Sequence, residues 1–156
     1  MQSFETANLR ELRTQLRVRL VQLLEADGTP ADRVAAGDPR GYADMITPAG
    51  LAEIAGYADV IGPDKDQVIP RDADGALTEP SALVHDAHAA GLLVHPYTFR
   101  NEPSTLASNY EGNPVNEYLN FYEIGVDGVF SDFPNTAFAA RELFWLQNGE
   151  WGEPDQ

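Results

Sequence analysis

Cysteine is absent from this 156-residue chain. Its absence excludes disulfide bridges, zinc–thiolate sites, iron–sulfur clusters and thiol nucleophiles. A domain of this size folds without bridges, so the missing cysteines leave the cellular compartment open. No apolar run reaches the roughly 18 residues that a membrane-spanning helix needs. Residues 1–20 contain no signal-peptide core.

Basic residues are scarce as well. The chain has 10 Lys and Arg against 25 Asp and Glu, which gives a formal net charge of −15. A field of this sign repels the phosphates of nucleic acids and the surfaces of anionic membranes, so neither is an expected partner. It does not exclude an anionic substrate that a few basic groups or a metal hold locally.

The residues that are present suit a folded domain. Hydrophobic residues make up 43% of the chain and aromatic residues 10%, which is too apolar for a disordered segment. The length is that of one domain. We expect this domain over residues 1–146 and a C-terminal tail over residues 147–156.

Short apolar segments bounded by turn residues predict strands that are buried on both faces. They lie at residues 18–24, 58–62, 92–97 and 126–131. Their starts are about 33–40 residues apart, which is the spacing of βα units in an eightfold barrel. Residues 2–4 resemble the end of a further strand whose start is missing, so we expect the chain to begin inside an element.

Helix signals fill the gaps between these segments. Leucines recur at helical spacing near residue 12, and helix starts are predicted at Thr47-Pro48, Thr78-Glu79-Pro80, Asn113-Pro114 and Pro134. Strands that alternate with helices predict a parallel sheet and the α/β class. Long loops at 27–41, 63–78 and 99–113 follow the carboxyl ends of the predicted strands, where α/β proteins place their chemistry.

Five sequence segments carry a family resemblance. They are QSFE (2–5), LVQLL (20–24), ADVIGPDKD (58–66), VHPYTFRNE (94–102) and GVDGVFSDFPNTA (125–137). In this order they resemble the end of the fourth strand and the fifth to eighth strands of bacterial glycerophosphodiester phosphodiesterases. The His-Pro-Tyr-Thr form resembles the larger, exported type, whose members are often periplasmic or secreted.

The resemblance implies the second half, about strands 4–8, of a TIM (β/α)₈ barrel. It also implies hydrolysis of a small-molecule glycerophosphodiester to sn-glycerol 3-phosphate and an alcohol, with a divalent cation, calcium or magnesium. In the family, the catalytic His-Arg pair, the second catalytic His and the metal carboxylates lie on or after strands 1–3. None of these has a counterpart here, so this chain is expected to hold no catalytic residue and no metal, and to be inactive alone.

Strand alternation places Tyr97 on the same side as Leu93 and His95, at the loop end of its strand. In the family an aromatic at this position walls the glycerol pocket. The alternative is a core ring with a paired hydroxyl. His95 is a candidate polar group at the mouth of the site, although a hydrogen-bonded histidine in the barrel wall is the favoured interpretation.

Lys65 directly follows a predicted strand, where a lone cation can meet a phosphate. The alternative is a surface salt bridge to Asp64 or Asp66.

Three further residues are candidates at strand ends. Phe133 is expected to cover the pocket rim or the top of the barrel. Gln2 either reaches the site from its strand or belongs to an unordered chain end. Asp132 orients a site group or, as we favour, caps the last helix.

Three functions remain open from the sequence. The first is a truncated phosphodiesterase that supplies substrate shape. The second is a non-catalytic half-barrel that forms a homodimer through its open sheet edges. The third is an acidic α/β module that binds a small molecule.

Overall fold

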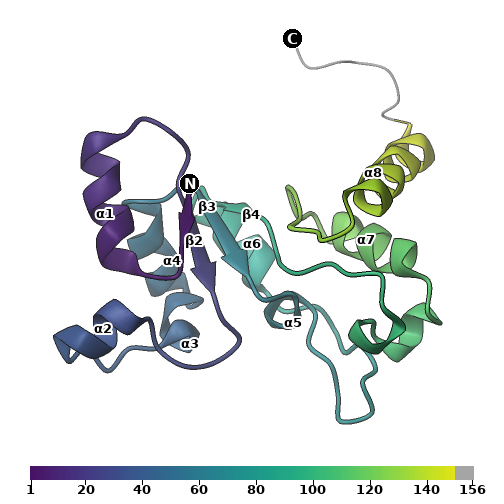
Figure 1. Ribbon diagram of the computed structural model, residues 1–156, viewed down its shortest axis with the longest axis horizontal. Helices are drawn as coiled ribbons and strands as arrows, with labels where there is room; N and C mark the ends of the chain where they lie inside the picture. Colours follow the sequence, from purple (N-terminus) through teal and green to yellow (C-terminus); the bar gives the residue numbers. More distant parts are fainter. Residues whose placement is uncertain (150–156) are drawn as a thin grey trace.

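A four-stranded parallel sheet lies at the centre of the computed structural model, which describes residues 1–149 (Figure 1). The strands are β1 (Gln2–Ser3), β2 (Val21–Leu24), β3 (Val60–Pro63) and β4 (Leu93–Val94), and they pair in sequence order. Gln2 is opposite Val21, Val21 is opposite Val60, and Val60 is opposite Leu93. The predicted α/β class with parallel pairing is confirmed.

The prediction of a regular strand over 126–131 is wrong. This segment runs beside residues 94–99, but its only strand-like pairing is an isolated parallel bridge between Ser131 and Phe99. The amide of Asp127 donates to the carbonyl of Val94 (3.0 Å), and the amide of Phe130 donates to the carbonyl of Pro96 (2.9 Å). The acceptors are two residues apart and the donors three, so one extra residue interrupts the ladder as in a β-bulge.

Three helices begin where the sequence predicts. They are α4 (Pro48–Ala55), α7 (Pro114–Glu123) and α8 (Pro134–Asn148), and α1 (Thr6–Gln15) covers the segment with leucines at helical spacing. The Thr47 hydroxyl accepts from the amide of Gly50 (3.1 Å), and the Asn113 side chain accepts from the amide of Val115 (3.1 Å). These side chains satisfy amides that the first helical turn leaves without partners.

Helix α6 (Leu83–Ala89) begins later than the predicted start at Thr78. The hydroxyl and the amide of Thr78 both donate to the carbonyl of Pro70, at 3.0 and 2.8 Å, so Thr78 closes the preceding loop instead of capping a helix. The loops also contain short helices that were not predicted. These are α2 (Ala31–Ala36), α3 (Tyr42–Met45), α5 (Lys65–Val68) and the 3₁₀ turns η1 (Pro103–Thr105) and η2 (Ser108–Tyr110).

The core joins one face of the sheet to the helices. Its buried members include Leu20, Leu24, Ile61 and Val94 from the sheet side, Leu51 and Ile54 of α4, and Ala87 of α6. Gln22 of β2 is fully buried among them, and its amide nitrogen donates to the carbonyl of Phe4 (2.9 Å). The Tyr57 hydroxyl donates to the Gln22 side-chain oxygen (2.8 Å), so this polar side chain is satisfied inside the core.

Helices α7 and α8 lie beyond the β4 edge of the sheet, whereas α1 to α3 lie near β1 and β2 (Figure 1). Helix α8 continues to Asn148, past the predicted domain end at residue 146, and Gly149 ends it with a positive φ of 74°. Residues 150–156 of the predicted tail lie outside the described residues. Within residues 1–149, no helix combines the length and the apolarity that crossing a bilayer requires.

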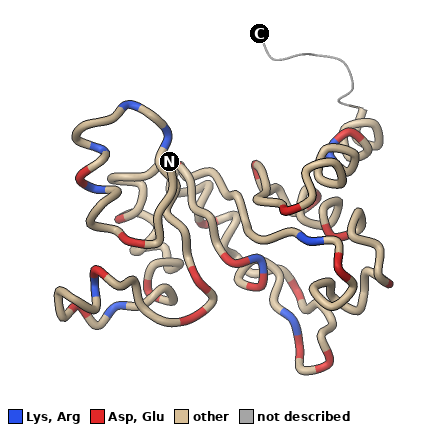
Figure 2. The backbone as a smooth tube through the Cα atoms, in the orientation of Figure 1, with Lys and Arg blue, Asp and Glu red and all other residues tan. Residues whose placement is uncertain are grey.

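Charge is distributed unevenly along the fold (Figure 2). Six of the 10 basic residues fall within the first 40 positions; they are Arg10, Arg13, Arg17, Arg19, Arg33 and Arg40. The segments that follow β3 and β4 are therefore poor in cations.

Candidate functional site

A cavity of about 420 Å³ lies beside the carboxyl ends of the strands. We call it the strand-end cavity, and its lining residues are Gln2, Phe4, Leu23, Tyr97, Thr98, Phe130, Ser131 and Asp132. They come from β1, from β2, from the segment after β4 and from the bulged segment 126–132. This is the edge at which parallel α/β sheets bind ligands.

Tyr97 contributes its ring to the strand-end cavity. Its hydroxyl donates to the carbonyl of Leu24 (3.0 Å), and its ring meets that of Phe4 edge to face, with centroids 6.0 Å apart. Burial raises the pKa of Tyr97, and the carboxylates of Asp64 and Glu25 raise it further. Tyr97 therefore stays protonated and acts as a fixed aromatic wall, with its hydroxyl already paired.

Gln2 joins Tyr97 in this lining. It belongs to β1 and pairs with Val21, so the end of the chain is ordered at this position. The structure thus brings two of the five predicted site residues into one cavity.

His95 lies outside the lining and packs in the wall of the sheet. A Cβ added to Gly128 would lie 2.9 Å from its Nε2 atom, and its ring meets that of Phe130 with centroids 6.3 Å apart. Burial lowers the pKa of His95, which favours the neutral ring. This placement agrees with the interpretation of His95 as a residue of the barrel wall. The neighbours of its ring are Gly128 and the ring of Phe130, however, and not the hydrogen-bond partner that this interpretation expects.

Lys65 is buried and does not line the strand-end cavity. Its Nζ atom donates to Glu117 Oε1 (2.7 Å) and to the carbonyl of Thr105 (3.2 Å). The alternative of a surface salt bridge to Asp64 or Asp66 is wrong, because Asp64 instead caps α5 by accepting from the amide of Asp66 (2.8 Å). A phosphate contact by Lys65 would first have to break the pair with Glu117.

Glu117 is the important residue that sequence reasoning missed. It is 1% exposed on α7, and Arg71 lies 3.6 Å from the same Oε1 atom that Lys65 contacts. Burial raises the pKa of Glu117, while Lys65 and Arg71 oppose that shift. Arg71 also donates to the carbonyl of Thr105 (3.1 Å), so one network joins the loops that follow β3 and β4. The signal that the sequence offers for Glu117 is its position beside the aromatic residues Tyr118 and Phe121, which are buried in α7.

Asp132 and Phe133 are neighbours at the start of α8, but only Asp132 lines the strand-end cavity. Asp132 lines the strand-end cavity and lies 3.3 Å from Arg100. The expectation that Asp132 caps α8 is wrong, because the cap position is Phe133 and no side chain caps this end. The amide of Phe133 donates to Ser131 Oγ (2.9 Å), and Phe133 does not line the cavity.

The strand-end cavity carries one charged side chain, Asp132. None of its lining residues, all within the described part of the chain, is Lys or Arg. The cavity therefore suits neutral or cationic groups, and it offers no positive charge to a phosphate.

The same residues do not fit a divalent cation. Residues 1–149 contain no group of three or more His, Asp or Glu placed to hold one. Calcium and magnesium need several oxygen ligands, whereas Asp132 is a single carboxylate that already faces Arg100.

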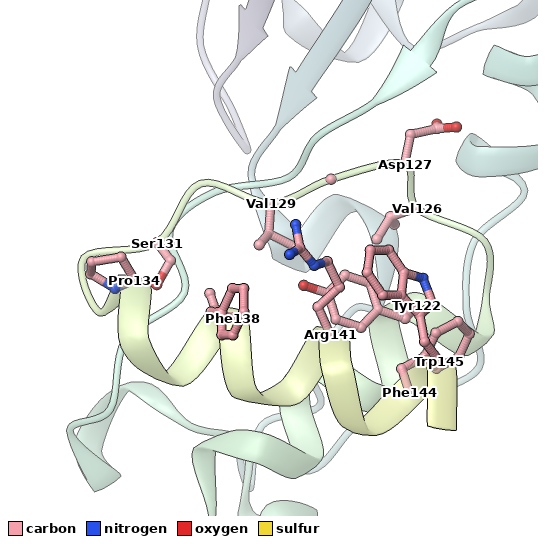
Figure 3. Close-up of a pocket in the computed structure, with 12 residues that line it drawn as sticks. Tyr122, Val126, Asp127, Val129, Ser131, Pro134, Phe138, Arg141, Phe144 and Trp145 are labelled. Atoms are coloured by element: carbon pink, nitrogen blue, oxygen red, sulfur yellow. The ribbon is translucent and has the colours of Figure 1, made fainter. Parts of the chain in front are cut away.

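A larger cavity, of about 550 Å³, lies between α8 and the segment 126–131 (Figure 3). We call it the α8 cavity. The guanidinium of Arg141 lies 4.6 Å from the ring centre of Trp145 and 5.1 Å from that of Phe138. Tyr122 and Phe144 complete its aromatic lining.

Comparison with known proteins shows the family to which this chain belongs. The model of the glycerophosphoryl diester phosphodiesterase family matches residues 1–136. The chain is 41% identical over 105 residues to glycerophosphodiester phosphodiesterase GDPD6 of Arabidopsis thaliana, covering 65% of this chain and 27% of that protein. It is 28% identical over 151 residues to the glycerophosphodiester phosphodiesterase of Haemophilus influenzae, covering 87% of this chain and 40% of that one.

Solved structures give the same fold. A candidate glycerophosphoryl diester phosphodiesterase from Silicibacter pomeroyi matches with a TM-score of 0.57 at 20% identity, covering 96% of this chain and 38% of that one. One from Agrobacterium tumefaciens matches with a TM-score of 0.54 at 21% identity, covering 93% and 44%. The chain thus spans less than half the length of each of these relatives, as a partial barrel would.

Proposed function

Because this chain belongs to the glycerophosphoryl diester phosphodiesterase family, we propose that it supplies the substrate-shaping part of such an enzyme. The reaction is hydrolysis of a glycerophosphodiester to sn-glycerol 3-phosphate and an alcohol. The observation that carries the proposal is the strand-end cavity, which Gln2 and Tyr97 both line at the carboxyl edge of a parallel sheet.

The chemistry of the cavity fits the organic part of the substrate. The ring of Tyr97 offers apolar contact to the glycerol carbons, worth about 1–3 kcal/mol together with nearby polar contacts. Its raised pKa keeps the proton on the hydroxyl, which is bonded to Leu24. Tyr97 therefore holds the substrate and moves no proton.

Hydrolysis needs groups that this cavity does not supply. Phosphodiester cleavage requires neutralisation of the phosphate charge and a proton donor for the leaving alcohol. The strand-end cavity has neither a Lys nor an Arg in its described lining, and His95 lies outside it. We therefore expect the chain to be inactive alone.

A chimera tests the proposal. In the Haemophilus influenzae relative, the stretch that matches this chain over 151 residues is replaced by this chain. We expect the chimera to hydrolyse glycerophosphocholine in the presence of calcium. A folded chimera without activity, beside an active parent enzyme, would overturn the proposal.

Self-association is a second candidate function, favoured by exposed apolar surface. Phe138 is 58% exposed and Leu146 is 54% exposed on α8, and β1 has β2 as its one partner in the described sheet. Two copies that pair their open edges would bury such surface. Light scattering at tens of micromolar tests this, since a strict monomer would rule out the homodimer.

A further inference from the structure

Three arginines line a third cavity, of about 430 Å³, which we call the arginine cavity. They are Arg10 of α1, Arg33 of α2 and Arg40, and Glu53 of α4 lines the cavity with them. The chain has only 10 basic residues and a formal net charge of −15, so three guanidinium groups at one place are a local exception. In the described structure, the arginine cavity and the strand-end cavity share no lining residue.

The guanidinium of Arg33 is buried but makes no hydrogen bond within residues 1–149. Arg33 is 6% exposed, and its one ion-pair contact among these residues is with Glu53 Oε1, at 3.6 Å. This distance exceeds the roughly 2.7–2.9 Å of a charge-assisted hydrogen bond. A buried charge costs free energy unless it is paired and hydrogen-bonded. Arg33 is therefore a buried cation that still lacks a close anion.

Asp32 precedes Arg33 in the sequence but does not pair with its guanidinium. One oxygen of Asp32 accepts from the Thr6 hydroxyl (2.8 Å) and from the amide of Ala7 (2.6 Å). The other oxygen accepts from the backbone amide of Arg33 (2.9 Å). Asp32 thus holds α2 to the start of α1, and its charge is already balanced by these donors.

Glu53 is shared between the other two arginines. Its Oε1 atom accepts from Nη2 of Arg10 (2.7 Å), and its Oε2 atom accepts from Nη1 of Arg40 (2.9 Å). Arg40 also donates through Nη2 to Asp38 (2.6 Å). Arg10 and Arg33 both lie beside Glu53 Oε1, so a single anion can reach the two guanidinium groups together.

We propose that the arginine cavity binds a phosphate dianion, either inorganic phosphate or the phosphate group of a small monoester. The planar fork of a guanidinium matches phosphate oxygens, and two such forks from different helices suit a tetrahedral anion. A simple carboxylate would only repeat the contacts that Glu53 already makes. A dianion with more oxygens can bridge Arg10 and Arg33 while Glu53 remains in place. This site goes beyond the proposed function and does not rest on it.

Titration of the purified chain with inorganic phosphate tests the proposal. Sodium chloride keeps the ionic strength constant, and NMR follows the backbone amides of residues 31–36. We expect saturable shifts there with phosphate and with sn-glycerol 3-phosphate, and the tighter of the two identifies the form that the cavity takes. Acetate is expected to bind at least roughly 10-fold more weakly, because it carries one charge fewer. Shifts that do not saturate, or equal affinity for acetate, would overturn the proposal.

Replacement of Arg33 separates a binding role from a structural one. Arg33→Met retains most of the buried stem and should weaken phosphate binding roughly 10- to 100-fold. Without phosphate its Tm should not fall, because the variant removes a buried charge that lacks a close partner. The control Arg141→Met, in the α8 cavity, should leave phosphate affinity unchanged. A lower Tm of the phosphate-free Arg33→Met chain, or unchanged affinity, would overturn the proposal.

Replacement of Glu53 should act in the opposite direction. Glu53→Gln removes the carboxylate that competes for Arg10 and Arg33, so phosphate should bind roughly 3- to 10-fold more tightly. Weaker binding in this variant would contradict the proposal, because Glu53 would then support the anion instead of competing with it.

The outcomes separate this inference from the proposed function. An active chimera, together with a purified chain that does not bind phosphate, overturns the phosphate site alone. Phosphate binding by the purified chain, together with a folded but inactive chimera, overturns the phosphodiesterase role and leaves the phosphate site standing.

Discussion

The α8 cavity and the strand-end cavity differ in size in the opposite order to the functional role that we propose for them. The α8 cavity, of about 550 Å³, is larger than the strand-end cavity, of about 420 Å³. The larger one is built mainly by α8 and the segment 126–131 (Figure 3). The smaller one collects residues from several strand ends. Parallel α/β sheets bind ligands at the carboxyl ends of their strands, so our proposal follows the position of the cavity and not its volume.

The two cavities also differ in what supports them. Beyond the strand ends, the buried pair of Lys65 and Glu117 joins the segment after β3 to α7. Arg141, over the α8 cavity, is a surface residue that pairs with Glu142 at 3.3 Å. Substitutions near the strand ends should therefore affect stability and ligand binding strongly, and those near α8 should affect them little.

The largest effect is expected from Glu117→Leu. This change leaves the Lys65 ammonium buried without its partner, which should reduce the free energy of unfolding by about 3–5 kcal/mol. Urea denaturation measures it. The double variant Lys65→Met/Glu117→Leu should regain most of the loss, because apolar pairs often replace buried ion pairs without penalty. A single variant as stable as the parent would show that this pair does not hold the loops.

The next effect is expected from Tyr97→Ala in the chimera. Loss of the ring should lower kcat/KM for glycerophosphocholine by roughly 10- to 100-fold. Tyr97→Phe should lose much less, because the ring supplies most of the contact. The pH profile and the metal affinity should stay unchanged. If Tyr97→Ala lowers Tm while kcat/KM stays intact, Tyr97 is a core residue and not a pocket wall.

A smaller effect is expected at α8. Phe138→Ser replaces a side chain that is 58% exposed, so the free energy of unfolding should change by less than about 1 kcal/mol. Urea denaturation measures this change. A loss of more than about 2 kcal/mol would mean that the Phe138 ring contributes to the core despite its exposure.

The smallest effect concerns His95 and pH. Its folded-state pKa is lowered by burial, so the unfolded chain binds the proton more readily. The contribution of His95 to stability is therefore lost as the pH falls through its unfolded pKa of about 6.5. Urea midpoints measured on either side of this pH should fall less in His95→Gln than in the parent chain. The same pH dependence in both proteins would contradict this assignment.

Local signals in the sequence predicted much of this fold. The helix starts at Pro48 and Pro114 follow from capping residues next to proline. The bulge near Gly128 depends on its register against residues 94–96, which no local pattern contains. Lys65 and Glu117 are 52 positions apart, so tertiary packing alone reveals the pair.

The rate at which the isolated chain hydrolyses glycerophosphocholine with calcium tests the central claim most directly. That claim is that this chain shapes the substrate site and carries no group for proton transfer or phosphate neutralisation in its strand-end cavity. The purified 156-residue chain is expected to show no hydrolysis above the buffer rate. Hydrolysis above that rate by the pure chain would contradict the claim.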